Sequence, residues 1–378
     1  MLQRVSSFAL GIVGGGVIGA ACAQAAARRG LSVGLFEPGP SLGVGAASPA
    51  SAGMLAAQLD PADDAATGLA VRAREVYGDL AASLKDTTGI DIGLWREGIA
   101  WLAFSDPEAE RLGNAVAGQR QAGLRADWLE PEEVTERWPG VAGPPDCRGA
   151  LFSPEDGAVD PRALTQALLA DAQRLGMVLI PEAVEAITVA DGRVRGIATR
   201  RQTVPVERVV IAAGAWSPRI RGVPRRLAVE PVRGQLAATP WPVATPPAIL
   251  YSDHAYVVAR GGKAILGSTM ERAGFDCRPT VEGLGQVYVG AFRLLPPLAT
   301  LPVEREWAGL RPVTPDGRPI VGADPEIAGL WYATGHGRNG VLLAALTGEI
   351  IGDLVATGTT SVDISSWDVT RFGPEADG

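Results

Sequence analysis

The chain carries two different patterns of hydrophobic and polar positions, and the change between them falls near its middle. In the first half, short apolar runs are separated by longer amphipathic stretches, which is typical of strands that alternate with helices. Strands are expected there at residues 8–13, 31–36, 98–104, 177–180, 184–199 (a hairpin turning at Asp191-Gly192) and 209–213. Helices are expected at residues 18–29, 68–86 and 107–121, with another that starts at Asp160-Pro161 and ends at Gly176.

In the second half the apolar runs are short and are separated by turn residues, which indicates an antiparallel sheet. Its strands are expected at residues 232–238, 249–251, 256–259 and 264–267. A helix at 281–294, strands at 304–310 and 330–333, and a closing helix at 340–356 follow. This order predicts an α/β fold in which a Rossmann-like dinucleotide-binding unit is split along the chain by a β-rich insertion.

A glycine-rich turn joins the first strand to the first helix. Gly14, Gly16 and Gly19 fit the pattern G-x-G-x-x-G, which provides a tight turn, close backbone approach to a pyrophosphate, and close helix–strand packing. The N-terminus of the following helix offers free N–H groups and a partial positive charge to phosphates. Glu37 ends the second strand, near the spacing of about 20 residues expected of an acid that binds a ribose hydroxyl. These features together predict a dinucleotide-binding unit.

The same N-terminal run has a competing interpretation as a secretory signal peptide. Arg4 precedes an apolar stretch, and Ala21-Cys22-Ala23 resembles a cleavage site. Cleavage there would remove the glycine turn and leave Glu37 without its motif. The glycines 14–16 are also unfavourable in a membrane-inserting helix, so the dinucleotide site is the preferred interpretation.

Composition narrows the function further. The 378 residues are 47% hydrophobic and 20% charged, with a net charge of −8, which is ordinary for a globular chain of two domains and gives no indication of nucleic acid or an anionic membrane surface. Beyond the N-terminal run we find no apolar run near the ~18 residues of a membrane span. Cys22, Cys147 and Cys277 are too scattered for a disulfide framework or a zinc site. With only two histidines, no metal site is expected. A reduced, cytoplasmic setting is the default, and the chemistry is expected to come from the cofactor.

Three further positions are candidates for substrate or cofactor contacts. Arg311 lies where a strand is expected to meet Pro312, and its planar fork suits a carboxylate, although an ion pair with Glu306 or Asp316 is an alternative. The turn 335–340 could direct N–H groups at a cofactor oxygen, or could simply reverse the chain. His254 and Tyr256 would share one face of a strand, lining a pocket or lying in the core.

Several segments together resemble the D-amino-acid oxidase-like flavoproteins, and within them the glycine oxidases of thiamine biosynthesis. The resemblance spans essentially the whole chain. The segments that carry it are residues 14–19 with Glu37, 52–55, 159–161, 210–217, 233–235, 251–256, 267–270 (Gly-Ser-Thr-Met), 309–312 and 335–343.

The resemblance implies a two-domain fold of the D-amino-acid oxidase and glutathione reductase type that binds FAD non-covalently. The FAD-binding domain would comprise residues 1–90, 146–226 and 306–378, and the substrate-binding domain residues 91–145 and 227–305. The residues that the resemblance places on the cofactor are Gly14, Gly16, Val17, Ile18, Gly19, Glu37, Pro38, Ala47, Ser48, Ala52, Gly53, Met54, Val184, His336, Gly337, Arg338, Asn339, Gly340, Val341 and Leu342.

The resemblance also implies the reaction. Arg311 would bind the substrate carboxylate, assisted by Tyr256 and Arg338, and a hydride would leave Cα for the flavin without a general base. The imine would hydrolyse to a 2-oxo acid and ammonia, and O₂ would be reduced to hydrogen peroxide. Two departures from the family pattern are Gly337, where a bulky residue is usual, and Ala259, where a proline usually precedes the arginine. Cys277 lies in no motif for covalent flavin attachment.

Alternatives remain open within this framework. The substrate is expected to be glycine or a similar small amine, but sarcosine, proline or a D-amino acid, with a quinone as acceptor, is a related possibility. An NAD-dependent dehydrogenase and a flavin-bound scaffold without catalysis are the other classes. The family suggests a homo-oligomer, such as a tetramer.

Overall fold

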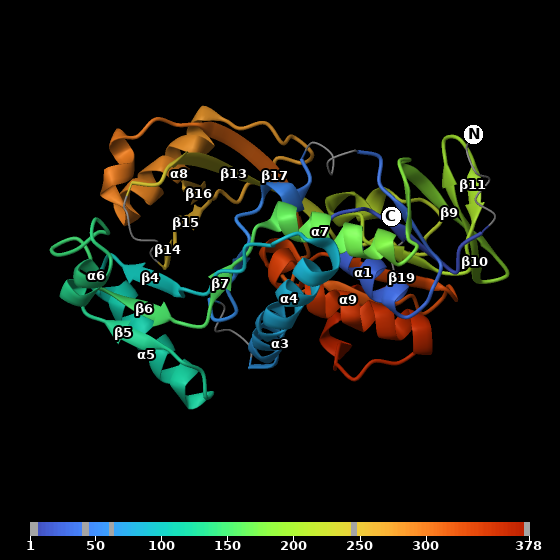
Figure 1. Ribbon diagram of the computed structural model, residues 1–378, viewed down its shortest axis with the longest axis horizontal. Coiled ribbons are helices and arrows are strands. Elements are labelled where there is room, and N and C mark those ends of the chain that lie inside the picture. The colour runs from blue at the N-terminus through green and yellow to red at the C-terminus, as the bar shows by residue number, and fades with distance from the viewer. Residues whose placement is uncertain (1–6, 40–44, 60–63, 243–247, 374–378) are drawn as a thin grey trace.

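The computed structural model describes residues 7–39, 45–59, 64–242 and 248–373. Within these ranges the chain forms two large sheets, one in each half of the elongated molecule (Figure 1). Both sheets contribute residues to the walls of one cavity.

The first large sheet has six strands in the order β18-β19-β12-β1-β2-β8. All of its pairings are parallel except that of β18 with β19, and β1 lies inside the sheet between β12 and β2. Its strands are β1 (Leu10–Val13), β2 (Val33–Phe36), β8 (Val178–Ile180), β12 (Val209–Ile211), β18 (Ile320–Ala323) and β19 (Leu330–Thr334). Ligands bind at the carboxyl ends of such strands, and the glycine turn follows β1 there.

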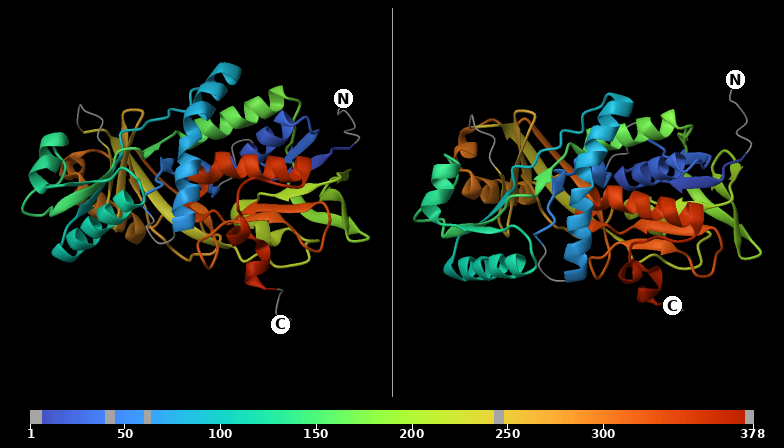
Figure 2. Two further views of the ribbon diagram at one scale, coloured as in Figure 1. Left: turned by 90° about the horizontal axis from the view of Figure 1, so that it is seen from below. Right: turned by 60° about the horizontal axis from the view of Figure 1, so that its bottom comes forward.

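Helices cover one face of this sheet, and a small sheet covers the other (Figure 2). The helices are α1 (Val17–Arg28), α3 (Asp64–Glu75), α4 (Tyr77–Thr88), α7 (Pro161–Arg174) and α9 (Gly340–Thr357). The small sheet consists of β9 (Val184–Ala190), β10 (Arg193–Thr199) and β11 (Thr203–Pro205). Alternate residues of β1 supply the two cores, because Ile12 packs under the helices and Val13 packs against the small sheet.

Helices α1 and α9 pack closely, since small residues face each other between them. A Cβ at Gly348 would lie 2.7 Å from the carbonyl oxygen of Ala21, so only glycine fits there. The stretch Gly337–Thr357, which contains α9, is long and apolar enough to cross a membrane by length and composition, but 61% of its most apolar window is buried inside the structure. The expectation that no apolar run beyond the N-terminal one approaches the length of a membrane span is therefore wrong. This stretch is long and apolar because α9 is buried in the core of the protein.

The second large sheet has eight strands in the order β17-β13-β16-β15-β14-β4-β6-β5, and only the pairing of β14 with β4 is parallel. Its strands are β4 (Ile99–Ala103), β5 (Asp127–Leu129), β6 (Gly149–Ser153), β13 (Glu230–Pro240), β14 (Ile249–Tyr251), β15 (Tyr256–Arg260), β16 (Lys263–Gly267) and β17 (Arg305–Val313). Helices α6 (Pro131–Arg137) and α8 (Val281–Leu294) cover one face. The opposite face packs α5 (Asp106–Gln121) at its β4–β6 end, and elsewhere Leu236 and Tyr256 turn toward the cavity.

Short elements connect these layers. They are α2 (Ala47–Ala50), the pair β3 (Met54–Leu55) and β7 (Gly157–Ala158), and the 3₁₀ turns η1 (Gly214–Arg219), η2 (Pro296–Thr300), η3 (Gly337–Asn339), η4 (Ser365–Trp367) and η5 (Val369–Phe372). The predicted domain boundaries at residues 146 and 306 fall next to β6 and β17, and both strands pair inside the eight-stranded sheet. The division into two domains at those boundaries stays a prediction.

Candidate active site

A cavity of about 750 Å³ lies between the two large sheets. This volume is within the roughly 300–1,000 Å³ of most small-molecule sites. The predicted site residues that line it are Gly14, Gly16, Val17, Ile18, Glu37, Pro38, Ala47, Ser48, Ala52, Gly53, Met54, Val184, Tyr256, Arg311, His336, Gly337, Arg338, Asn339, Gly340 and Val341. Gly19 and Leu342 do not line it: Gly19 packs against the backbone of Gly14, and Leu342 is buried in the helical core.

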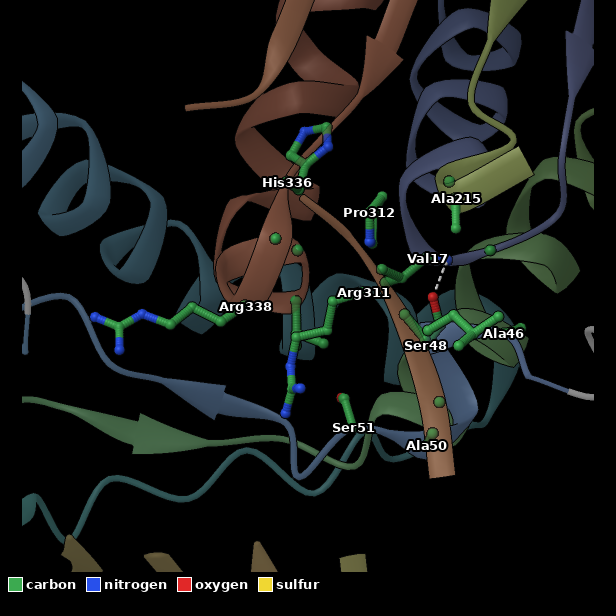
Figure 3. Close-up of a pocket in the computed structure, with 18 of the residues that line it drawn as sticks. Val17, Ala46, Ser48, Ala50, Ser51, Ala215, Arg311, Pro312, His336 and Arg338 are labelled. Atoms are coloured by element: carbon green, nitrogen blue, oxygen red, sulfur yellow. Dashed lines mark hydrogen bonds between the residues drawn. The ribbon is translucent and has the colours of Figure 1, made fainter. Parts of the chain in front are cut away.

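The glycine turn forms one end of the cavity. Gly14 has a φ of +104°, and a Cβ there would lie 2.6 Å from the carbonyl oxygen of Ala212, so the turn requires glycine. The N–H of Val17, at the start of α1, donates to Ser48 Oγ over 3.0 Å (Figure 3). Glu37 accepts a hydrogen bond from the N–H of Gly15 over 2.8 Å, which holds its carboxylate beside the turn.

These residues fit a bound dinucleotide. The N-terminal N–H of α1 meets only a hydroxyl oxygen, which a phosphate oxygen can replace. Ser51 also lines the cavity, and its buried Oγ has no hydrogen-bond partner within the described parts of the chain. A buried hydroxyl without a partner is costly, so Ser51 is suited to a polar group of a ligand. Sequence reasoning selected its neighbours Ser48 and Ala52 but missed Ser51.

Arg311 supplies a guanidinium to the other part of the cavity. Its Nη1 donates to the carbonyl oxygen of Thr269 over 3.0 Å, and its Nη2 donates to Ser268 Oγ over 2.6 Å. Burial lowers the pKa of Arg311, and the neighbouring charge of Arg338 lowers it further, while Tyr256 opposes both. A cation held by neutral oxygens alone keeps its charge available for an anionic ligand.

Among the residues that the structure describes, Arg311 makes no ion pair with an acid, so that alternative is wrong there. Asp316 pairs with Arg371, and Glu306 accepts a hydrogen bond from Tyr288. The expectation that Arg311 lies at a strand end is wrong, because β17 continues through Pro312 to Val313 in the antiparallel sheet. Pro312 is tolerated because β17 is the edge strand of this sheet.

Gly234 of β13 makes room for Arg311, because a Cβ at Gly234 would lie 2.1 Å from Nη1 of Arg311. We therefore expect Gly234→Ala to displace the guanidinium and raise the KM for a carboxylate substrate about tenfold or more. Steady-state kinetics measures this, and Gly118→Ala, in α5 with open space at its Cβ, is the matched control. An unchanged KM in Gly234→Ala would show that the guanidinium does not bind the carboxylate.

Tyr256 lies beside this guanidinium in the same cavity. It is 7% exposed, and burial raises its pKa although Arg311 and Ser268 oppose the shift, so its hydroxyl stays protonated. A Cβ at Gly267, its partner on β16, would lie 2.3 Å from the tyrosine ring. Two glycines therefore allow the two predicted substrate residues to come together.

Arg338 enters the cavity from η3, and its side chain extends away from Arg311 (Figure 3). Its Nη1 donates to the hydroxyl of Tyr251 over 3.5 Å, and the ring of Tyr251 packs edge-on against Trp101. Asp253 accepts hydrogen bonds from Trp101 and Arg111. The structure thus places Arg338 among polar and aromatic groups at an exposed part of the cavity.

His254 also lines the cavity, but it does not share a strand with Tyr256. β14 ends at Tyr251 and β15 begins at Tyr256, so His254 belongs to the turn between them and is exposed. Ser252 Oγ accepts from the N–H groups of His254 and Ala255, which closes this turn. The predicted alternation was wrong because the side chain of Ser252 replaces a strand pairing.

His336 is turned away from Arg311 and into the helical core (Figure 3). Its Nε2 lies 3.0 Å from the hydroxyl of Thr347 on α9, and 3% of its surface is exposed. Burial lowers the pKa of His336 from 6.5 to about 3, so the ring is neutral at ordinary pH. The side chain therefore fixes the turn before α9, while its backbone lines the cavity.

This buried histidine predicts a loss of stability in acid. Below pH 6.5 the unfolded chain takes up a proton that the folded chain refuses until about pH 3, so the free energy of unfolding falls by about 1.4 kcal/mol per pH unit. Asp156 acts in the opposite direction, because burial raises its pKa to about 6 and the folded chain then binds the extra proton.

The measurement is therefore a difference between two proteins. Urea unfolding gives the free energy of unfolding of wild type and of His336→Gln at each pH. We expect the wild-type value minus the variant value to fall by about 2 kcal/mol between pH 6.5 and pH 5. A difference that is the same at both pH values would mean that the histidine ionises freely in the folded protein.

Several other residues line the cavity although the sequence analysis assigned them no role in the site, and many of them belong to the segments 210–217, 233–235, 251–256, 267–270 and 309–312 that carry the family resemblance. These residues are Val13, Phe36, Ala46, Ala50, Ser51, Ala56, Leu59, Ala183, Ala212–Trp216, Arg219, Ile220, Gly234, Leu236, Tyr251, Ser252, Asp253, Ala255, Ser268, Met270, Gly309, Leu310, Pro312, Ala333 and Thr334. The stretch Ala212–Trp216 follows β12 directly, so the rule that ligands lie beyond parallel strand ends could have assigned it to the cavity.

A phosphate-binding turn on a parallel sheet, facing a guanidinium and a tyrosine on an antiparallel sheet, defines a dinucleotide-dependent enzyme that acts on a small anionic substrate. The comparisons give the family. The chain matches the family described as FAD dependent oxidoreductase over residues 10–354 and belongs to it. It is therefore an FAD-dependent oxidoreductase of the D-amino-acid oxidase type.

Individual relatives are similar over nearly the whole chain. Glycine oxidase of Geobacillus kaustophilus is 36% identical, over 95% of this chain and 96% of the relative. The crystal structure of glycine oxidase from Geobacillus kaustophilus superimposes with a TM-score of 0.91 at 34% identity, covering 97% of this chain and 99% of that one. The bifunctional protein ThiO/ThiG of Trichormus variabilis is 34% identical, over 97% of this chain and 55% of that longer protein.

Proposed function

We propose that this protein oxidises glycine and similar small amines to the corresponding 2-oxo acid. In the proposed reaction, glycine, water and O₂ give glyoxylate, ammonia and hydrogen peroxide. The relatives named glycine oxidase and ThiO/ThiG support this substrate, and the second name supports a role in supplying oxidised glycine to thiamine biosynthesis.

One observation carries the proposal: the guanidinium of Arg311 lies in the cavity, and within the described parts of the chain it has no carboxylate partner. Its hydrogen bonds to Thr269 and Ser268 fix the plane of the fork. A carboxylate of an amino acid can then accept two parallel hydrogen bonds from the remaining N–H groups. The Tyr256 hydroxyl, kept protonated by burial, is placed to donate another.

The FAD would be held by the residues around the glycine turn and by the backbone of the turn before α9. Glu37 would bind the adenosine ribose, Val17 and Ser48 the diphosphate, and Asn339 and Gly340 would direct N–H groups toward the flavin ring, without a covalent bond. When bound, FAD accepts the electrons of the amine and passes them to O₂. Arg338, with Arg311 and Tyr256, would complete the substrate contacts.

The cavity offers little for general base catalysis near Arg311. Its two carboxylates in the described residues both have partners, since Glu37 binds the N–H of Gly15 and Asp253 binds Arg111. Of the two histidines that line the cavity, His336 is buried and bonded to Thr347, and His254 is exposed in the turn between β14 and β15. This supports loss of the Cα hydrogen as a hydride from the neutral amine, with the protein supplying orientation and charge.

The direct test is purification, a visible spectrum and peroxide detection with glycine, sarcosine and D-alanine. We expect a yellow protein that forms peroxide with glycine. Anaerobic addition of the same amines shows which of them reduces the flavin, independently of the electron acceptor. In a quinone-dependent enzyme the amine would bleach the flavin, but the reduced flavin would react slowly with O₂. A flavin that no amine bleaches would contradict the proposal.

A related activity on larger amines is the second candidate, and Gly337 favours it. Gly337 lines the cavity with a φ of +53°, and a Cβ there would meet no atom within 4 Å. The cavity therefore has free space beside Arg338 that N-methyl or ring substituents can occupy. Kinetics with sarcosine and proline against glycine decide between the two candidates.

We also propose a cytoplasmic homo-oligomer, with a tetramer as the expected form. The exposed face of α8 supports association, since Val281 and Val289 are 93% and 72% exposed. Light scattering coupled to gel filtration measures the subunit number. A monomer at micromolar concentration would contradict this part of the proposal.

A further inference from the structure

Arg219 is a cation on the cavity wall that the proposed reaction does not use. It is the last residue of η1 and lines the cavity. Within the described residues it has no ion pair and no hydrogen bond through its side chain. Its guanidinium instead lies over the ring of Phe275, with Cζ 3.6 Å from the ring centroid. A guanidinium stacked in this way keeps its N–H edge free for an anion.

The position of η1 shows which part of the cavity Arg219 faces. Just before η1, the carbonyl oxygen of Ala212 packs against Gly14 of the glycine turn. Just after it, the N–H of Arg221 donates to the carbonyl oxygen of Glu185 over 3.1 Å, next to Val184. Arg219 therefore lies on the wall between the glycine turn and Val184. Figure 3 shows Ala215 of η1 on the same side of the cavity as Val17.

Phe275 is held in place from the opposite sheet. It belongs to residues 271–280, here called the strap, which connects β16 to α8 and reaches across to η1. Phe275 also packs against Trp216, with ring centroids 5.6 Å apart. The strap thus joins the two halves of the cavity wall through one aromatic side chain.

Buried polar residues of β13 anchor both ends of the strap. Arg233 exchanges backbone hydrogen bonds with Glu271 and donates a side-chain hydrogen bond to the carbonyl oxygen of Arg278 over 3.1 Å. Gln235 accepts from the N–H of Thr280 over 2.7 Å and donates to the Glu271 carboxylate over 2.6 Å. Because Gln235 is fully buried and Arg233 nearly so, the strap has a fixed path.

We propose that Arg219 binds the diphosphate of FAD, and that the strap positions its guanidinium through Phe275. The diphosphate carries two negative charges, and the glycine turn supplies only backbone N–H groups and the helix N-terminus. Arg219 adds a full positive charge beside them. Arg219 is then a cofactor-binding residue and Phe275 a positioning residue, whichever amine the enzyme oxidises.

The test is the dissociation constant of FAD, measured on apoprotein by quenching of flavin fluorescence with no amine present. We expect Arg219→Gln to weaken FAD binding about fivefold at low ionic strength, and we expect the difference to vanish near 1 M NaCl because salt screens an exposed charge. Arg195→Gln, which removes an exposed arginine outside this cavity, should leave the constant unchanged. Equal constants for wild type and Arg219→Gln at low salt would overturn the proposal. A fivefold difference that persists in 1 M NaCl would overturn the diphosphate assignment and indicate stacking on the adenine.

A double-mutant cycle tests the role of the strap. Phe275→Ala should weaken FAD binding in the wild-type background and have no effect in Arg219→Gln, because it acts through that guanidinium. Equal weakening in both backgrounds would show that Phe275 contributes independently, which overturns its positioning role. Since these measurements contain no substrate, they stand apart from any failure to oxidise glycine.

Discussion

Replacing Arg311 by alanine is expected to raise the KM for glycine by about 100-fold or more while the protein stays yellow. The loss comes from two charge-assisted hydrogen bonds to the substrate carboxylate, each worth about 1.5–3 kcal/mol. FAD content should persist because the Arg311 side chain donates its hydrogen bonds to Thr269 and Ser268, which follow β16 on the side of the eight-stranded sheet. Steady-state kinetics and the absorbance spectrum give both quantities.

Arg311→Lys is the informative companion. It keeps the positive charge but loses the fork, so its KM should fall between those of wild type and Arg311→Ala. Turnover of an amine without a carboxylate should change little in either variant. Glycine kinetics unchanged in Arg311→Ala would remove the basis for the proposed substrate class.

Gly19→Ala is expected to abolish FAD binding at micromolar cofactor, although Gly19 does not line the cavity. A Cβ at Gly19 would lie 1.9 Å from the carbonyl oxygen of Gly14, so the start of α1 must move away from the glycine turn. The N–H of Val17 would then move away from the proposed diphosphate position beside Ser48, and the overpacking itself costs about 1–3 kcal/mol of stability. The purified variant should be colourless.

Gly68→Ala provides the matched control for this substitution. Gly68 lies in α3, and a Cβ there would meet no atom within 4 Å. Alanine is the better helix former by up to about 1 kcal/mol, so this variant should be yellow and slightly more stable. A yellow Gly19→Ala protein with normal thermal stability would show that the turn tolerates a side chain.

The sequence was sufficient for the elements whose signals are local. The helix expected at 281–294 is α8 with the same bounds, and Asp160 caps α7 as predicted by accepting from Arg162 and Ala163. The hairpin turn at Asp191-Gly192 also forms, with a positive φ at both residues. In each case the determining contacts lie within a few residues.

The elements that were missed or divided depend on distant contacts. The expected helix 68–86 is two helices, α3 and α4, with Val76 between them, and the buried Tyr77 hydroxyl donates to the carbonyl of Val341 at the start of α9. β3 and β7 are two-residue strands that pair with each other, and Ala158 of β7 also pairs with Trp95, which lies far from both in sequence. A single local pattern contains none of these contacts.

The candidate site divides along the same lines. The glycine turn and Glu37 were found because their motif is continuous in sequence. Gly234 lies in a segment that carries the family resemblance, but its role was not predicted, because that role comes from the contact with Arg311 of another strand. Ser51 was missed, because only the folded cavity shows that its hydroxyl is buried without a partner among the described residues. Arg219 belongs to this second group as well.

Helices α1 and α9 cannot slide or separate easily, since Gly348 rests on the backbone of Ala21 and a Cβ at Gly352 would lie 2.7 Å from Arg29. Both begin at residues of the cavity wall, Val17 and Gly340. The end of the cavity proposed for the nucleotide and the end proposed for the flavin ring are thus connected by one closely packed helix pair. New amine specificities are then expected to arise through exchanges on the eight-stranded sheet or at Gly337 of η3, because neither changes the contact between α1 and α9.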